Sequence, residues 1–147
     1  MTRYLADTNI LLRSAQPSHP AHPATVTGTQ ALLGRGDTLR VIAQNLIEFW
    51  RVATRPVDRN GLGMTTDDTL AELVQIKNLF ELLPDTPAIY PEWERLVVQH
   101  AVSGKNVHDT RIVAAMNVHG ISHLLTFNVA DFKRFLRITI VSPSDVE

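Results

Sequence analysis

Short apolar runs of strand length alternate along the chain with longer segments whose apolar residues recur at helical spacing. Strands are predicted at residues 4–6, 38–43, 82–83, 123–126 and 138–141, where the side chains are mostly apolar or β-branched. Helices are predicted between them, over residues 9–13, 23–33, 44–54, 65–80, 91–103, 108–118 and 131–135. Strands that alternate with helices form parallel sheets covered on both faces. The pattern therefore predicts a three-layer α/β/α fold with four or five parallel strands.

Length and composition indicate that these elements belong to one domain. The 147 residues have an ordinary hydrophobic fraction of 44%, and residues 1–147 are expected to form a single domain without repeats. The net charge of −1 gives no bulk attraction to nucleic acid, and the lack of cysteine excludes disulfides and thiolate metal sites. Asp7 interrupts the N-terminal apolar run, and no run is long enough to span a membrane, so we expect a cytoplasmic protein.

Two predicted helices carry apolar residues whose surroundings bear on function. Residues 44–54 are apolar on more than one side, which predicts a mostly buried helix. The stripe from Leu70 to Phe80 fits the core, and it fits a surface for a partner equally well. The sequence leaves both interpretations of this stripe open.

Three acidic residues stand in apolar surroundings. Asp7 follows a predicted strand, at the edge where parallel sheets bind ligands. Glu48 is the only acid in its helix, and Asp109 opens a largely apolar helix. Carboxylates are rarely buried without a partner, and the sequence shows no Lys or Arg partner for these three. A shared Mg²⁺ or Mn²⁺ ion would serve as that partner, because such ions prefer carboxylate oxygens.

Each acid also has a local explanation. Asp7 is a suitable N-cap for the helix that follows it. Asp109 is placed to stabilise a helix N-terminus through the helix dipole. Glu48 would face solvent if its helix were less buried than predicted. From the residues alone, a shared metal site and three separate local roles both stay open.

A further signal comes from four short segments in a fixed order. They are Tyr-Leu-Ala-Asp-Thr-Asn-Ile-Leu at 4–11, Asn-Leu-Ile-Glu-Phe at 45–49, His-Asp-Thr-Arg-Ile-Val-Ala-Ala at 108–115 and Leu-Leu-Thr-Phe-Asn-Val-Ala-Asp-Phe at 124–132. Each segment alone is a weak signal. Together, in this order and at these separations, they resemble the motifs of PIN-domain ribonucleases, most closely the VapC-type toxins of toxin–antitoxin pairs. The resemblance covers nearly the whole chain.

This resemblance implies an endoribonuclease that depends on Mg²⁺ or Mn²⁺ and leaves 5′-phosphate and 3′-hydroxyl ends on RNA. It implies Asp7 and Asp109 as metal ligands, and Glu48 as the residue that orients or deprotonates the attacking water or completes the metal shell. It also implies an antitoxin protein as partner, and either a homodimer or a heteromer with the antitoxin. The residues that would support the site are Asn9, Asn45 and Thr126.

The chain departs from the family pattern at two positions. Asn128 stands where an aspartate is common, so the fourth acidic position is predicted to be Asn128 assisted by Asp131, with one tightly bound ion. Asn45 stands where Ser or Thr is common, three residues before Glu48. The substitution at Asn128 keeps an alternative open, in which the chain is a catalytically weak or inactive PIN-like module that binds RNA or a protein.

Basic residues near the four segments are candidate contacts for RNA phosphates, although an ordinary solvated surface explains each of them singly. They are Arg13, Arg51, Arg55, Lys105 and Arg111. His108 is expected to be structural. Other families fit less well. Asn9 occupies the place of the second aspartate of haloacid-dehalogenase-like enzymes, and the chain has neither the paired acids of a receiver domain nor a G-x-G-x-x-G segment.

Overall fold

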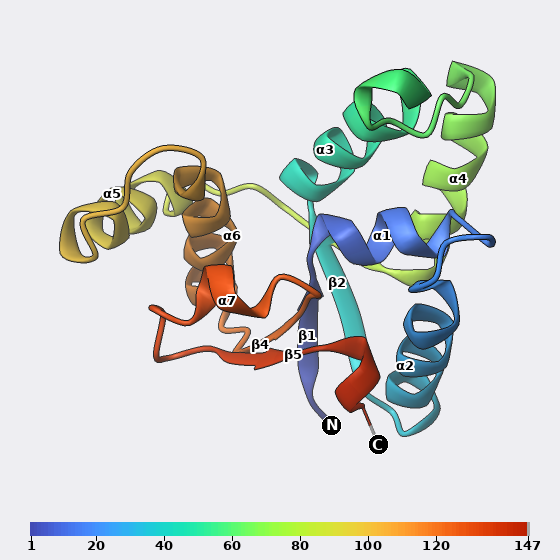
Figure 1. The fold of residues 1–147 in the computed structure, drawn as a ribbon. Helices are drawn as coiled ribbons and strands as arrows, with labels where there is room; N and C mark the ends of the chain where they lie inside the picture. Colours follow the sequence, from blue (N-terminus) through green and yellow to red (C-terminus); the bar gives the residue numbers. More distant parts are fainter. Residues whose placement is uncertain (147) are drawn as a thin grey trace.

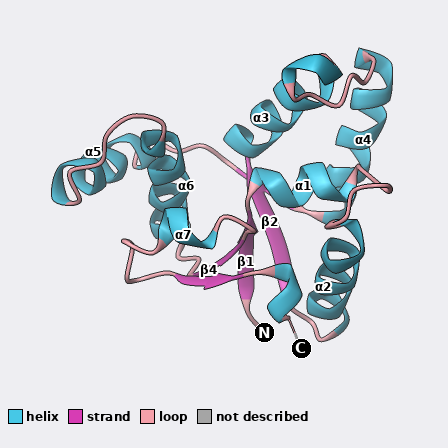
Figure 2. Ribbon diagram, in the orientation of Figure 1, coloured by secondary structure: helices cyan, strands magenta, loops and turns pink. Residues whose placement is uncertain are grey.

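A parallel sheet of five strands forms the middle layer of the computed structural model, which describes residues 1–146 (Figures 1 and 2). The strands are β1 (Arg3–Ala6), β2 (Thr38–Ile42), β3 (Glu81–Leu83), β4 (His123–Leu125) and β5 (Thr139–Val141). Their order in the sheet is β3-β2-β1-β4-β5, and every neighbouring pair is parallel. The predicted three-layer fold is confirmed.

Seven α-helices connect the strands in the described part of the chain. They are α1 (Thr8–Ser14), α2 (His22–Gly34), α3 (Ala43–Thr54), α4 (Thr66–Leu79), α5 (Ile89–Gln99), α6 (Asn106–His119) and α7 (Val129–Phe132), with short 3-10 helices at Val57–Arg59 and Pro143–Asp145. Local signals explain several of their ends. The Thr65 hydroxyl accepts a hydrogen bond of 3.1 Å from the Asp68 N–H at the start of α4. Gly120, with φ +69°, ends α6. Over residues 1–146, none of these helices has the length and apolar character needed to span a membrane.

Each face of the sheet has its own hydrophobic core. Alternate residues of β1 point to opposite faces, so Leu5 packs in one core while Tyr4 and Ala6 pack in the other. Helices α5, α6 and α7 cover the Leu5 face, and α1 to α4 contribute to the core on the Tyr4 face (Figure 1). This alternation explains why β1 is apolar at three successive positions.

The chain changes direction across the sheet next to β1. From β1 it passes to β2 and β3 on one side, and it then returns to place β4 and β5 on the other side. Residues that follow β1 and β4 therefore meet at the carboxyl edge of the sheet, at the switch point where such folds bind ligands. Asp7 follows β1 and Thr126 follows β4, so both lie at this edge.

The prediction that residues 44–54 form a mostly buried helix is wrong. Only Asn45, Phe49 and Ala53 are buried in α3, and they form one stripe at four-residue spacing. The side chain of Ile47 is 68% exposed. Helix α3 leaves the end of β2 and points away from the sheet (Figure 1), so only one flank packs, against α1 and α4. Counting apolar residues could not reveal this placement.

The stripe on α4 divides between core and surface. Ile76 is buried in α4, as is Phe80 directly after it, and both belong to the core on the Tyr4 face. Leu70 and Val74 are 52% and 46% exposed. The C-terminal half of the stripe is therefore core, and the N-terminal half remains a surface.

Candidate active site

Asp7 is buried at the end of β1, where it caps α1. One carboxylate oxygen, Oδ1, accepts a hydrogen bond of 2.8 Å from the Thr8 N–H. The other, Oδ2, accepts bonds from the Thr126 hydroxyl at 2.8 Å and from the Asn9 side-chain amide at 3.3 Å. Burial raises the pKa of Asp7, and the nearby charges of Glu48 and Asp131 raise it further, whereas the bonds from Thr126 and Thr8 lower it. Asp7 therefore caps α1, as its local interpretation proposed, and it also lies near the charges of Glu48 and Asp131.

Thr126 is the polar centre beneath Asp7, and its side chain is fully buried. Its hydroxyl donates to Asp7 and accepts from the Asn9 amide at 3.2 Å and from the Asn128 N–H at 3.0 Å. The side-chain Oδ1 atom of Asn9 in turn accepts from the Phe127 N–H at 3.2 Å. These bonds tie the start of α1 to the segment after β4, and they bring Asn9 and Thr126 into contact with the Asp7 carboxylate.

Glu48 projects from α3 toward the same edge. Its Oε2 atom accepts a hydrogen bond of 2.9 Å from the Thr8 hydroxyl, and its Oε1 atom accepts one of 3.1 Å from the Gln44 side-chain amide. Asn45 lies behind this pair, fully buried. Its side-chain Oδ1 atom accepts from the Ile42 N–H at 2.9 Å, and its side-chain amide nitrogen lies 3.4 Å from the Thr8 hydroxyl oxygen. Asn45 therefore contacts Glu48 only indirectly, through the Thr8 hydroxyl that both of them bind.

Asp109 lies in the first turn of α6, across the edge from Asp7. Its carboxylate accepts no hydrogen bond from any residue in the described part of the chain, 1–146. Burial raises its pKa to about 6, and the charges of Asp7, Asp131 and Glu48 add to that rise, while Lys105 opposes it. The charges of the other three carboxylates therefore act on Asp109, which, unlike Asp7 and Glu48, accepts no hydrogen bond within residues 1–146.

This arrangement fits a hard divalent cation. Within residues 1–146, no three acidic or histidine side chains are close enough together to hold a metal ion as they stand. The acids nevertheless surround one edge, and a partly buried carboxylate without a hydrogen bond is a suitable ligand. Asp7 and Asp109 are the residues that would hold the ion.

The predicted fourth position is divided between two residues. The side chain of Asn128 is exposed and makes no hydrogen bond within residues 1–146, and only its N–H binds Thr126. The charge of Asp131, on α7, reaches both Asp7 and Asp109 and raises the pKa of each. By electrostatics, Asp131 is the stronger candidate.

The five candidate basic residues are not gathered at one place. Lys105 is close enough to influence Asp109, and Arg111 contacts Gln44 and Asp85. Arg13 binds Gln16, and Arg55 binds the Asn60 carbonyl, both outside the acidic edge. Arg51 is exposed and contacts none of the acids.

Sequence reasoning missed Thr8 and Gln44, the two residues that contact Glu48 directly. Thr8 lies between the two motif residues Asp7 and Asn9. Gln44 precedes Glu48 by four residues, a spacing that places two side chains on the same helical face. That spacing was the available signal.

Comparison with known proteins supports the same assignment of fold. A family model described as the PIN domain matches residues 4–137. VapBC2 from Rickettsia felis, solved bound to a promoter DNA fragment, has a TM-score of 0.73 at 17% identity, with 96% of this chain and 98% of that chain covered. No curated protein matches the sequence.

Two further solved structures share the fold. FitAcB from Neisseria gonorrhoeae has a TM-score of 0.70 at 16% identity and covers 97% of this chain and 99% of its own. Mycobacterium tuberculosis VapC20, described as a toxin that cleaves the sarcin-ricin loop, has a TM-score of 0.65 at 13% identity, with 90% and 95% covered. At these identities the likeness concerns the fold.

Proposed function

Because the chain belongs to the PIN-domain family, we propose that it is a divalent-metal-dependent endoribonuclease that acts as the toxin of a toxin–antitoxin pair. The observation that carries this proposal is the partly buried carboxylate of Asp109, unpartnered in the described part of the chain. Its carboxylate lacks a hydrogen bond within residues 1–146, and burial together with three other carboxylates raises its pKa to about 6. A cation held between Asp109 and Asp7 would relieve this repulsion.

In the proposed reaction, the scissile phosphate lies at the edge formed by Asp7, Asp109 and Glu48. When bound there, Mg²⁺ or Mn²⁺ would supply charge neutralisation and polarisation of the phosphate. Glu48 orients a water molecule and accepts its proton as the water oxygen attacks phosphorus. The bond between phosphorus and the 3′ oxygen breaks, and that oxygen takes a proton from solvent. The products carry a 5′-phosphate and a 3′-hydroxyl.

The remaining polar residues position these groups. Thr126 and Asn9 fix the Asp7 carboxylate, and Thr8 fixes one oxygen of Glu48. Asp131 adds charge beside Asp7 and Asp109, which strengthens the attraction for a cation. Asn128 adds none, so one ion is favoured over two.

The decisive experiment measures cleavage of a single-stranded RNA in Mn²⁺ and in excess EDTA. We expect cleavage only with the metal, and a loss of at least about 1,000-fold in Asp7→Asn and in Asp109→Asn. Asp58→Asn, on the 3-10 helix at Val57–Arg59, is the matched control and should cleave normally. Full cleavage in EDTA, or by Asp7→Asn or Asp109→Asn, would refute the proposal.

Mn²⁺ binding without any RNA cleavage would favour the alternative of a catalytically weak module that binds RNA or protein. The specific observation behind this alternative is Asn128, whose exposed side chain brings no charge to the fourth position. Cleavage by the Asn128→Asp variant, but not by the natural chain, would support it.

The proposed partner is a small antitoxin protein, because solved VapBC complexes share the fold. Exposed Leu70 and Val74 on α4 are a candidate surface for the antitoxin or for a second copy of the chain. Expression of the chain alone should arrest growth, and co-expression with the adjacent reading frame should restore it. Harmless expression of an active enzyme would contradict the toxin role.

A further inference from the structure

We propose that Gln44 is a positioning residue for Glu48, and that Arg111 and Asp85 hold Gln44 in the orientation this requires. The inference rests on the proposed function, because it assumes that Glu48 acts on the attacking water. It assigns Arg111 a role other than the phosphate contact predicted from the sequence.

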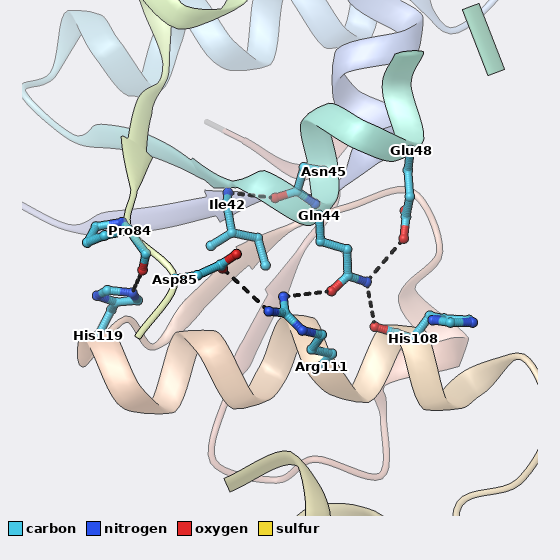
Figure 3. A network of polar contacts seen from close by, with 9 residues as sticks. All are labelled: Ile42, Gln44, Asn45, Glu48, Pro84, Asp85, His108, Arg111 and His119. Carbon is cyan, nitrogen blue, oxygen red and sulfur yellow. Dashed lines mark hydrogen bonds and ion pairs between the residues drawn. The ribbon is translucent and has the colours of Figure 1, made fainter. Parts of the chain in front are cut away.

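The four residues form a continuous chain of contacts (Figure 3). The Gln44 side-chain nitrogen donates to Glu48 Oε1 at 3.1 Å and to the His108 carbonyl at 2.8 Å. The Gln44 side-chain oxygen accepts from Arg111 Nη1 at 3.2 Å. Arg111 Nη2 forms an ion pair of 3.4 Å with Asp85 Oδ1. Every polar atom of the Gln44 side chain therefore has a partner.

These partners permit only one orientation of the Gln44 carboxamide. Glu48 and the His108 carbonyl are acceptors, so the amide nitrogen must face them. Arg111 is a donor, so the amide oxygen must face it. Rotation of the carboxamide by 180° would oppose oxygen to oxygen and nitrogen to nitrogen. The contacts of Gln44 consequently fix the direction in which Glu48 Oε1 receives its hydrogen bond.

The contacts of Gln44 also connect two acids that lie on different helices. Glu48 and Gln44 lie on α3, whereas His108 and Arg111 flank Asp109 in the first turns of α6. Gln44 contacts both flanking residues, and it thereby ties the α3 carboxylate to the helical turn that carries Asp109. Figure 3 shows the Gln44 side chain reaching from α3 toward α6 between Glu48 and Arg111.

The ion pair between Arg111 and Asp85 contributes mainly by orienting the Arg111 side chain, and only weakly by its own attraction. The side chains of Arg111 and Asp85 are 34% and 48% exposed, so solvent weakens their attraction. Asp85 follows β3 and holds the Arg111 guanidinium on the side that faces Gln44. An Arg111 already occupied by Asp85 and Gln44 is less available to RNA than a solvated arginine would be.

The first experiment compares Gln44→Met with Gln44→Glu. Methionine keeps the length of the side chain and removes all three hydrogen bonds. Glutamate can still accept from Arg111 but cannot donate to Glu48. We expect kcat for RNA cleavage to fall about 10- to 100-fold in both variants, with KM changed less than about threefold. Gln99→Met is the matched control, because Gln99 also accepts from an arginine, Arg95, and lies on α5.

Two outcomes would overturn the proposal. One is wild-type kcat in Gln44→Met. The other is wild-type kcat in Gln44→Glu, which would mean that only the contact with Arg111 matters and that donation to Glu48 does not.

A second experiment separates the two roles of Arg111. In Asp85→Asn the charge that occupies Arg111 is removed. If Arg111 positions Gln44, kcat should fall about threefold to tenfold while KM stays the same. If Arg111 binds RNA phosphates, its release should lower KM and leave kcat unchanged, and that result would contradict the proposal.

A readout that does not depend on activity is the NMR signal of the Gln44 side-chain amide in protein without metal. We expect Glu48→Ala to shift both amide protons, and Gln99→Met to leave them in place. Unshifted protons would refute the contact. Should the natural chain cleave no RNA, the proposed function fails, while this measurement still decides whether Gln44 holds Glu48.

Discussion

Asp7 and Asp109 are the two proposed ligands of one ion, and their surroundings differ sharply. Asp7 is 5% exposed and accepts three hydrogen bonds, from Thr8, Thr126 and Asn9. Asp109 is half-buried and accepts none within residues 1–146. Both have a raised pKa, because burial and neighbouring carboxylates disfavour the charge on each.

The difference assigns separate tasks to the two residues. Asp7 is part of the hydrogen-bond framework formed with Thr126 and Asn9, which joins the segment after β1 to the segment after β4. The charge of Asp109 lowers the stability of the fold at neutral pH, and a bound cation would offset this cost. In the proposed site, hydrogen bonds therefore fix Asp7 before an ion binds, whereas Asp109 would gain its partner from the ion. The following variants test this division, from the largest expected effect to the smallest.

Thr126→Val should give the largest loss of stability, because it removes the buried hydroxyl that donates to Asp7 and accepts from Asn9 and the Asn128 N–H. We expect the free energy of unfolding to fall by about 2–4 kcal/mol in urea. Thr126→Ser keeps the hydroxyl and should lose only about 1 kcal/mol. Equal stability of the Val and Ser variants would show that Asp7 does not depend on this framework.

Addition of Mn²⁺ should stabilise the natural chain by nearly as much. At a concentration a hundred times the dissociation constant, the expected gain is about 2.7 kcal/mol, or a rise in Tm of roughly 8 °C by scanning calorimetry. Asp58→Asn should show the same rise, and Asp109→Asn should lose most of it. A rise of the same size in Asp109→Asn would remove Asp109 from the ligand set.

Asp109→Asn should stabilise the protein in the absence of metal, although it abolishes the proposed activity. A pKa of about 6 in place of 3.8 corresponds to at most about 3 kcal/mol. Solvent reaches this half-buried group, so we expect a gain of about 1–2 kcal/mol at pH 7. Urea unfolding of both proteins measures it, and a loss of stability would contradict the unpartnered state of Asp109.

The same variant should change how stability depends on pH. Folding raises the pKa of Asp109, so between its ordinary value of 3.8 and about 6 the folded protein binds more protons than the unfolded chain. The stability from Asp109 is therefore present below pH 4 and is lost as the pH rises through 6. Asp109→Asn should show a shallower decline over this interval than the natural chain. Parallel curves would refute the assigned shift.

Asn128→Asp should have the smallest effect, because the side chain at position 128 is exposed. We expect a change of less than about 0.5 kcal/mol in the free energy of unfolding without metal. The added charge should also raise the pKa of Asp109 further, as followed by NMR titration. An unchanged pKa would place residue 128 outside the acidic edge.

The sequence predicted the order of elements and the acids at the carboxyl edge, because strand and helix periodicities and the four motifs are local signals. It failed for α3, whose apolar residues did not reveal that only the stripe of Asn45, Phe49 and Ala53 finds a neighbour. It also missed Thr8 and Gln44. Thr8 contacts Glu48 on another helix, and Gln44 also contacts His108 and Arg111 on α6, so these contacts depend on how the helices pack. The spacing of four between Gln44 and Glu48 was a local signal, but polar pairs at this spacing are common on surface helices.

The central claim is that Asp7 and Asp109 share one divalent ion, and Mn²⁺ titration by isothermal calorimetry tests it most directly. The natural chain and Asp58→Asn should each bind one ion with the same affinity. Asp7→Asn and Asp109→Asn should each bind at least about tenfold more weakly. Undiminished binding in Asp109→Asn, or no binding by the natural chain, would contradict the claim.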